Sequence, residues 1–202
     1  MLFRIVIVCL VLAASYATYQ LISINRYYHD LRTPKAAFTI LDHDGNQNPL
    51  TIVEFMHYDC EYCKDSHAVL VDYVKTTPET RLVTRPVPFD AGGAELAARR
   101  ALAAGLQGKF WEMDSALAEY KHPMDEKFYR ESAALYDIDY DRMVKDAENT
   151  EVFDLAKDNA RAAQLSGLQT TPALLIGKTL YQLDAPLTLP DLIRMVHEEQ
   201  QK

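Results

Sequence analysis

The sequence predicts an α/β domain in which a block of helices is inserted between two groups of strands. Runs rich in β-branched and aromatic residues occur in the first half of the chain and return near its end. Between them, over about residues 90–166, apolar residues recur at helical spacing. Neither group contains enough strands for a stable sheet, so we expect both groups to form one sheet.

The first half of the domain is expected to follow the order β-β-α-β. Turn-forming residues over 42–49 predict a hairpin loop between the first two strands, and Pro78 ends the helix. The strands are predicted over residues 37–41, 50–58 and 81–87, and the helix over residues 61–75.

The middle of the chain is expected to contain five helices. Asp90 is a candidate N-cap for the first of them, and Asn149 or Thr150 for the last. They are predicted over residues 90–106, 109–120, 125–136, 139–147 and 150–166. Beyond this block, the pattern predicts strands over 173–176 and 179–183 and a final helix that begins at Thr188.

The N-terminus is predicted to direct the chain out of the cytosol. Residues 1–24 carry a single charge, Arg4, and are otherwise almost wholly apolar. Ser15-Tyr16-Ala17 suits a cleaved signal peptide, whereas the length of the apolar stretch suits an uncleaved membrane anchor. A buried core helix is disfavoured, because a helix that is apolar on all faces needs a large core around it. Residues 25–36 are polar and are expected to form a linker.

The composition excludes several classes of protein. The 202 residues are 49% hydrophobic and 25% charged, which excludes a mainly disordered chain and a polytopic membrane protein. The net charge of −8 argues against a nucleic-acid-binding protein, which usually carries a basic stripe. Because Cys9 lies in the apolar N-terminal segment, the exported part contains one close cysteine pair and not a disulfide framework.

The most informative motif is Cys60-Glu-Tyr-Cys63, at the junction of a predicted strand and helix. Free N–H groups and the helix dipole stabilise a thiolate in the first helical turn. The spacing places both sulfurs on one side of that turn, within bridging distance. One thiolate can then attack a disulfide while the other resolves the mixed disulfide. The motif therefore predicts redox chemistry, with an inert disulfide as the alternative.

A metal site is another interpretation of the same segment. The side chains of His57, Cys60, Cys63 and His67 suit zinc or copper. Structural zinc sites usually join two separated ligand pairs, however, whereas these four residues lie close together in the sequence. Taken alone, His67 is interpreted as a histidine on the helix surface.

Glu54 lies inside the apolar run that precedes the motif. A carboxylate in a buried strand is costly unless it is paired or functional. Glu54 could take or give the proton that thiol–disulfide exchange moves, and a partly exposed strand residue is the alternative. Arg85 on the following strand is a candidate counter-charge for Glu54, or an ordinary surface arginine.

Thr170-Thr171-Pro172 stands directly before the strand predicted over residues 173–176. A proline is tolerated at the start of a strand, where its nitrogen need not donate a hydrogen bond. From spacing alone the Thr171–Pro172 bond is expected to be trans, since only about 5% of such bonds are cis.

These features, in this order, resemble the DsbA-like thioredoxin-fold thiol–disulfide oxidoreductases of the bacterial envelope, over about residues 37–198. The similarity is closest to the Com1-like branch of these proteins. It implies a thioredoxin fold with a helical insertion, over about residues 90–166, between the CxxC half and the cis-Pro half. The matching segments are IVEFMHYDCEYCK, GKFWEMDSALAEYK and GLQTTPALLIGKTLYQL.

The resemblance also implies roles for individual residues. Cys60 is then the attacking thiol, Cys63 the resolving thiol and Glu54 the buried acid. The bond before Pro172 is then cis, and the backbone of Thr171 binds an extended substrate peptide. Tyr62 is a further candidate substrate contact, whereas Phe110 and Trp111 are assigned to the core of the insertion.

The chain departs from this family at residues that tune the redox pair. Glu61-Tyr62 stands between the cysteines in place of the Pro-His of strongly oxidising members. A carboxylate opposes a neighbouring thiolate, so Glu61 and Asp59 are expected to raise the pKa of Cys60. A less stable thiolate makes the couple more reducing, and solvent screening limits the effect. We therefore expect a weaker oxidant, or an enzyme that also isomerises disulfides.

The leading hypothesis is an envelope oxidoreductase that oxidises cysteine pairs in newly exported proteins. It needs no cofactor, because the two sulfurs are the redox couple. The family implies reoxidation by a quinone-linked membrane partner of DsbB type. We expect a monomer in the periplasm, free or anchored to the inner membrane. A metal-handling protein is the second hypothesis, and a non-catalytic chaperone or binding module is the third.

Overall fold

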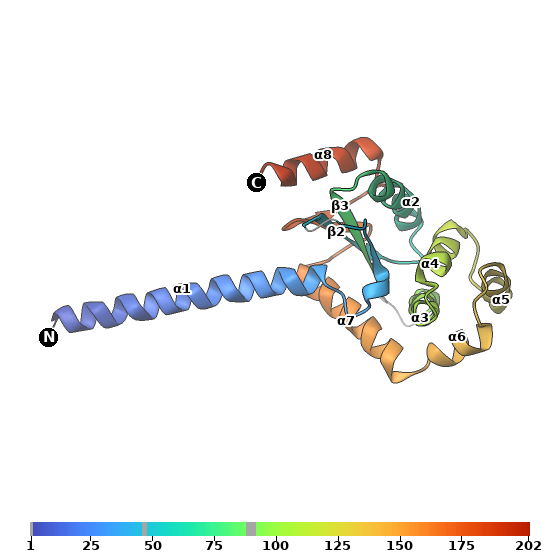
Figure 1. The fold of residues 1–202 in the computed structure, drawn as a ribbon, viewed down its shortest axis with the longest axis horizontal. Helices are drawn as coiled ribbons and strands as arrows, with labels where there is room; N and C mark the ends of the chain where they lie inside the picture. Colours follow the sequence, from blue (N-terminus) through green and yellow to red (C-terminus); the bar gives the residue numbers. More distant parts are fainter. Residues whose placement is uncertain (1, 46–47, 88–91) are drawn as a thin grey trace.

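A mixed β-sheet lies at the centre of the protein (Figure 1). The computed structural model describes residues 2–45, 48–87 and 92–202, and in these ranges the sheet has five strands in the order β1-β3-β2-β4-β5. β2 and β3 are parallel, and the other neighbours are antiparallel. Strands from both halves of the chain therefore share one sheet, as predicted. They are β1 (Ile40–Leu41), β2 (Leu50–Met56), β3 (Thr80–Pro86), β4 (Ala173–Ile176) and β5 (Thr179–Gln182).

Helices cover both faces of the sheet. The first face packs against α2 (Glu61–Thr76) and α8 (Leu189–Gln200), around a core that includes Ile52, Leu82 and Leu174. The opposite face packs against α7 (Thr150–Ser166) and the end of α1 (Leu2–Arg32). The alternation of side chains along a strand sends neighbouring residues of β2 and β3 to opposite faces.

The helical block forms a second core beside the sheet, in which Phe110 and Met113 are fully buried. Phe110 therefore belongs to the core of the insertion, as expected, and Trp111 packs half-buried against the same cluster. Besides α7, the block contains α3 (Gly93–Gly105), α4 (Phe110–Glu119), α5 (Glu126–Leu135) and α6 (Tyr140–Asp146).

The helix starts follow from capping side chains. The Asn149 side chain accepts a hydrogen bond from the Val152 N–H, and Thr188 accepts one from the Asp191 N–H. Both predicted caps are confirmed. The expected cap Asp90 lies outside the described residues.

The predicted hairpin between the first two strands is wrong. β1 pairs with β3, with Ile40 opposite Val83, and β3 separates it from β2. Residues 37–39 form a turn of 3-10 helix, so the strand expected over 37–41 is shortened. The physical reason lies in β2, which is buried on both faces and therefore takes a central place between β3 and β4.

The linker expected over residues 25–36 is helical as far as Arg32, and this part of the prediction is wrong. Leu31 is buried against the sheet, and the Tyr27 hydroxyl donates to the Leu165 carbonyl on α7. These contacts hold the end of α1, while the rest of α1 extends away from the domain (Figure 1).

The apolar segment predicted to be a signal peptide or a membrane anchor lies in α1 (Leu2–Arg32). Among the residues it describes, no helix is both long enough and apolar enough to cross a membrane.

Candidate redox site

Cys60 and Cys63 form a disulfide at the start of α2. Cys60 is the N-cap of the helix, and the Cys63 N–H donates to its sulfur over 3.1 Å. Cys63 is buried, with 1% of its surface exposed, whereas Cys60 is partly exposed. A sulfur of another protein can therefore reach Cys60, and Cys63 is shielded from solvent.

The loop from the second half of the chain meets this disulfide. The Thr171–Pro172 peptide bond is cis, so the expectation from the family resemblance is confirmed and the trans bond expected from spacing alone is wrong. The carbonyl oxygen of Thr171 lies 3.9 Å from the sulfur of Cys60. Tyr62 lies on the same helical turn and is 48% exposed, so it is accessible to a binding partner.

Gln182 holds the cis-Pro loop in place, a role that the sequence did not indicate. Its side-chain oxygen accepts hydrogen bonds from the N–H groups of Gln169 (2.6 Å) and Thr170 (3.0 Å). The loop backbone beside Cys60 is thus fixed by a side chain of the adjacent strand β5.

Glu54 lies beneath α2, on the face of the sheet that this helix covers. Only 3% of its surface is exposed, so the interpretation as a partly exposed strand residue is wrong. Its Oε2 atom is 2.8 Å from His67 Nδ1 on α2, and the Thr84 hydroxyl donates to the same oxygen over 3.2 Å. The buried carboxylate therefore has a cationic partner and a neutral donor.

His67 is not a surface residue, which corrects the prediction for it. Its exposed fraction is 3%, because it falls on the buried face of α2 four residues after Cys63. His67 Nε2 lies 3.0 Å from Asp114 Oδ2, on α4 of the insertion. The Tyr58 hydroxyl donates to Asp114 Oδ1 over 2.6 Å.

Two carboxylates therefore flank one imidazole. Burial opposes the charge of His67, but the carboxylates of Glu54 and Asp114 outweigh it and raise the pKa of His67 well above its usual value. Burial and the nearby Asp114 raise the pKa of Tyr58 well above its usual value, so this phenol stays neutral.

Asp114 was not predicted as a site residue, because it lies far along the chain from the CxxC motif, in the helical insertion. The spacing of Cys63 and His67 was the one available signal for the buried imidazole.

Arg85 is not the counter-charge of Glu54, so that prediction is wrong. Glu54 is paired with Thr84 across the ladder, and Arg85 points to the opposite face of the sheet. Its guanidinium donates to the carbonyl oxygens of Leu31 and Asp30 and to the side chains of Asp158 and Asn159.

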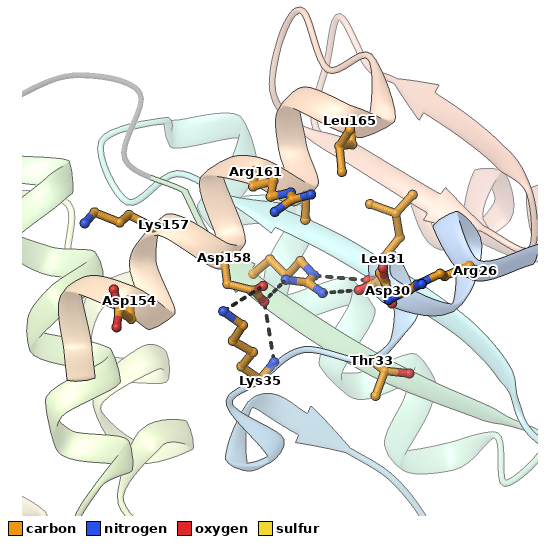
Figure 2. Close-up of a pocket in the computed structure, with 12 residues that line it drawn as sticks. Arg26, Asp30, Leu31, Thr33, Lys35, Asp154, Lys157, Asp158, Arg161 and Leu165 are labelled. Carbon is orange, nitrogen blue, oxygen red and sulfur yellow. Dashed lines mark hydrogen bonds and ion pairs between the residues drawn. The ribbon is translucent and has the colours of Figure 1, made fainter. Parts of the chain in front are cut away.

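Arg85 borders a cavity of about 500 Å³ between α1 and α7, together with Asp30, Leu31 and Asp158 (Figure 2). Arg85 is thus remote from the redox pair and joins the end of α1 to α7 and β3.

Asp59 and Glu61 flank Cys60, and both are exposed. Solvent can therefore screen the effect of their charges on Cys60, as expected. Lys64, on the next turn of α2, interacts electrostatically with both carboxylates. Burial lowers the pKa of Lys64, while the carboxylates of Asp59 and Glu61 act against that change by stabilising its charge. The redox pair therefore has a nearby cation that the sequence argument did not consider.

The geometry does not favour the alternative metal site. Cys60 and Cys63 are joined to each other, and His67 is directed at Glu54 and Asp114. Among the described residues, no three His, Cys, Asp or Glu side chains are arranged to hold a metal ion. This holds for the alternative set of His57, Cys60, Cys63 and His67 as well.

Comparison with solved structures places this fold among thioredoxin-like proteins. A thioredoxin-like oxidoreductase from Silicibacter pomeroyi DSS-3 is 26% identical, with a TM-score of 0.72, over 84% of this chain and 99% of the other. A periplasmic thioredoxin-like protein from Salmonella enterica serovar Typhimurium is 22% identical, with a TM-score of 0.70, over 88% and 98% of the two chains. The chain therefore has a thioredoxin-like fold.

Curated proteins and a family model also match this chain. The Na⁺/H⁺ antiporter NhaA 3 of Salinispora tropica is 27% identical over 130 residues, which is 63% of this chain and 20% of the antiporter. The chain thus spans about a fifth of the length of the curated relatives it matches. The family model described as thioredoxin matches residues 43–197. This match includes the disulfide, the cis-proline loop and the helices between them, and the chain belongs to the thioredoxin family.

Proposed function

We propose that this protein forms or exchanges disulfides in exported proteins through Cys60 and Cys63. One observation carries the proposal: a disulfide at a helix N-terminus exposes one sulfur beside a cis-proline loop and buries the other. The exposed sulfur suits attack by a client, and the buried one suits an intramolecular role.

The exchange follows from this geometry. A client thiolate attacks the sulfur of Cys60, the disulfide breaks, and Cys63 leaves as a thiolate. A second client thiolate then attacks the client sulfur of the mixed disulfide, and Cys60 leaves as a thiolate that the helix N-terminus stabilises. The client loses two electrons and the cysteine pair gains them. Glu54 contacts α2 at His67, four residues after Cys63, and is the candidate group for proton exchange with Cys63.

The cis-proline loop offers a binding place for the client. The backbone of Thr171 lies beside Cys60, where an extended peptide can add to it as a strand does. Tyr62, between the two cysteines, provides exposed aromatic surface next to the disulfide. A client cysteine bound here would lie next to the sulfur that it attacks.

We place this reaction in the periplasm. The apolar N-terminal segment supports export, and the similar Salmonella structure is described as periplasmic. The reduced pair would be reoxidised by a membrane protein of DsbB type, and the two sulfurs need no further cofactor. N-terminal sequencing of the exported protein would test cleavage after Ala17.

The decisive test is the equilibrium reduction potential of the pair, measured on the full chain by thiol gel-shift in glutathione buffers. A potential of about −120 to −200 mV, where oxidants and isomerases lie, supports disulfide donation. A potential near or below about −270 mV would make the protein a reductase or leave the disulfide static.

Cysteine variants provide the matched comparison. Cys60→Ser should abolish exchange, Cys63→Ser should trap mixed disulfides with clients, and Cys9→Ser, outside the pair, should leave exchange unchanged. If Cys60→Ser retained the biological role, the protein would instead be a non-catalytic binding module.

Glu61→Gln tests the tuning of the pair by its neighbours. Removing this exposed carboxylate should favour the thiolate and raise the reduction potential by no more than about 20 mV, since exposed charges interact by at most about 1 kcal/mol and about 30 mV corresponds to about 1.4 kcal/mol for this couple. Asp65→Asn, at an exposed position farther along α2, is the control. An unchanged potential in Glu61→Gln would refute the tuning.

A further inference from the structure

His67 has no part in the exchange steps above, although it touches the acid that serves them. We propose that His67 is a positioning residue for the exchange: held between Glu54 and Asp114, its imidazolium stabilises the charge of the Glu54 carboxylate, which takes the proton of the Cys63 thiol. The inference rests on the proposed function, because it concerns the same reaction.

The contacts of the ring define its charge. Nδ1 lies 2.8 Å from Glu54 Oε2, and Nε2 lies 3.0 Å from Asp114 Oδ2. A neutral imidazole has one N–H and one lone pair, whereas an imidazolium presents an N–H on both sides. A carboxylate at each nitrogen therefore fits the imidazolium. All three side chains are at least 96% buried, so water screens this attraction little.

The other groups around His67 do not replace its charge. Thr84 on β3 contributes a neutral hydroxyl to Glu54. Tyr58, just after β2, contributes a neutral phenol to Asp114. From α2 itself, the Lys64 ammonium donates to the Tyr120 carbonyl.

His67 also lines a cavity of about 500 Å³ between α2 and α4. The charged side chains of that cavity, other than His67 itself, are Lys64, Asp65, Asp72, Lys75, Glu119 and Lys121. Lys64 and Lys121 are bonded to the Tyr120 carbonyl and to Asp65. His67 is therefore a cation in direct contact with Glu54.

The cation, the acid and the inner sulfur lie on one side of α2. Cys63 and His67 are four residues apart on its buried face, and Glu54 contacts His67 from the strand below. Without the imidazolium, Glu54 and Asp114 would lose the opposite charge between them, and loss of an opposite charge favours the protonated form of a carboxyl group. A protonated Glu54 could not accept the proton of Cys63.

This arrangement matters when the pair is reoxidised. A disulfide of an oxidising partner reacts with Cys60 to form a mixed disulfide, and the first partner sulfur leaves. The Cys63 thiol then gives its proton to Glu54, and its sulfur attacks Cys60. The S–S bond to the partner breaks, the second partner sulfur leaves as a thiolate, and the partner has taken both electrons.

The test uses the full chain with glutathione as the partner disulfide. The mixed disulfide at Cys60 is formed from reduced protein and oxidised glutathione, and the rate of glutathione release by Cys63 is followed by quenched flow between pH 5.5 and 9. The variants are His67→Gln, which removes the charge, His67→Lys, which keeps a cation, and His197→Gln, a control on the exposed side of α8.

We expect His67→Gln to release glutathione about tenfold more slowly than the wild type at pH 6, because loss of an opposite charge at this distance changes carboxyl ionisation by about that factor or more. The deficit should disappear towards pH 9. His67→Lys and His197→Gln should follow the wild-type profile.

A His67→Gln profile that is lowered by one factor at every pH would overturn the inference, because it would reveal a purely structural role. If His67→Gln does not fold, His67→Lys decides: a wild-type profile supports the inference, and a loss confined to low pH overturns it. A wild-type protein that releases no glutathione at any pH would instead defeat the proposed function.

Discussion

The two faces of the central sheet carry buried charge clusters with different surroundings. On the face under α2, Glu54 pairs with His67 close to the disulfide. On the opposite face, Arg85 pairs with Asp158 at the end of α1. The ladder explains the separation, because Glu54 is opposite Thr84 and the next residue, Arg85, turns the other way.

The clusters also differ in how completely their charges are matched. Every nitrogen of the Arg85 guanidinium donates a hydrogen bond, so that cluster is a fixed joint between elements. Glu54 and Asp114 outnumber the one cation between them, so a proton can be added without breaking the cluster. We therefore expect the Arg85 cluster to govern stability and the Glu54 cluster to govern reactivity.

Arg85→Met should have the largest effect and should act on stability alone. Breaking a buried ion pair by removing one partner costs about 3 to 5 kcal/mol, and here the α1 carbonyls of Asp30 and Leu31 lose their donor as well. The free energy of unfolding from guanidinium titration measures this loss. The reduction potential of the folded variant should stay that of the wild type.

Arg161→Met is the control for Arg85→Met. Arg161 borders the same cavity (Figure 2) but is exposed, so its loss should change stability by no more than about 0.5 kcal/mol. Equal losses in the two variants would contradict the role of Arg85 as a joint. So would a shifted potential in Arg85→Met.

Glu54→Gln should slow the exchange more than it lowers stability, which is the reverse of the effect expected for Arg85→Met. General acid–base groups contribute about 100-fold or more to rates, equivalent to about 2.7 kcal/mol of barrier, so exchange should slow by about that factor. Stability should change less than in Arg85→Met, because His67 keeps its contact with Asp114. Thr84→Val, which removes only the neutral donor, is the matched control. Similar rates in both variants would refute the acid role of Glu54.

The fold was largely predictable because local signals determine most of its elements. Side-chain caps such as Asn149 and Thr188 set helix starts, and apolar runs such as that of β2 set strands. The position of β1 in the sheet was not predictable from the turn residues that follow it. Its pairing with β3 depends on which strands are buried on both faces, as β2 is. The helical end of α1 was not predicted, because one fully buried apolar residue, Leu31, and the partly buried Tyr27 and Tyr28 anchor a segment that is otherwise polar.

The redox site was predictable only in part. The residues of the motif and Pro172 are recognisable in the sequence, as is an acid in a buried run. The partner of that acid was assigned to Arg85 instead of His67, because the register between β2 and β3 decides which residue shares its face. Asp114 could not be found, because tertiary packing of the insertion brings it to His67.

The two charge clusters should also differ in how the stability that they contribute depends on pH. This effect should be smaller than the effects of Arg85→Met and Glu54→Gln. His67 has a raised pKa, so its charge stabilises the fold fully below about pH 6.5, the ordinary value for histidine. As the pH rises above 6.5 and through the raised pKa, this contribution is lost.

Guanidinium unfolding of the oxidised protein should therefore show the stability advantage of wild type over His67→Gln shrinking from pH 5.5 to pH 9. The corresponding difference between wild type and Arg85→Met should stay constant, because a guanidinium does not titrate in this range. A constant His67 difference would contradict the charged state assigned to the imidazole.

Tyr27→Phe should produce the smallest effect and refines the joint on the Arg85 side. Its hydroxyl donates to the Leu165 carbonyl and so ties α1 to α7 independently of Arg85. Loss of one such hydrogen bond costs about 1 kcal/mol, measured again by guanidinium unfolding. Tyr19→Phe, on the exposed part of α1, should cost nothing measurable. If Tyr27→Phe cost as much as Arg85→Met, the end of α1 would be held mainly by α7, and the guanidinium would be a secondary contact.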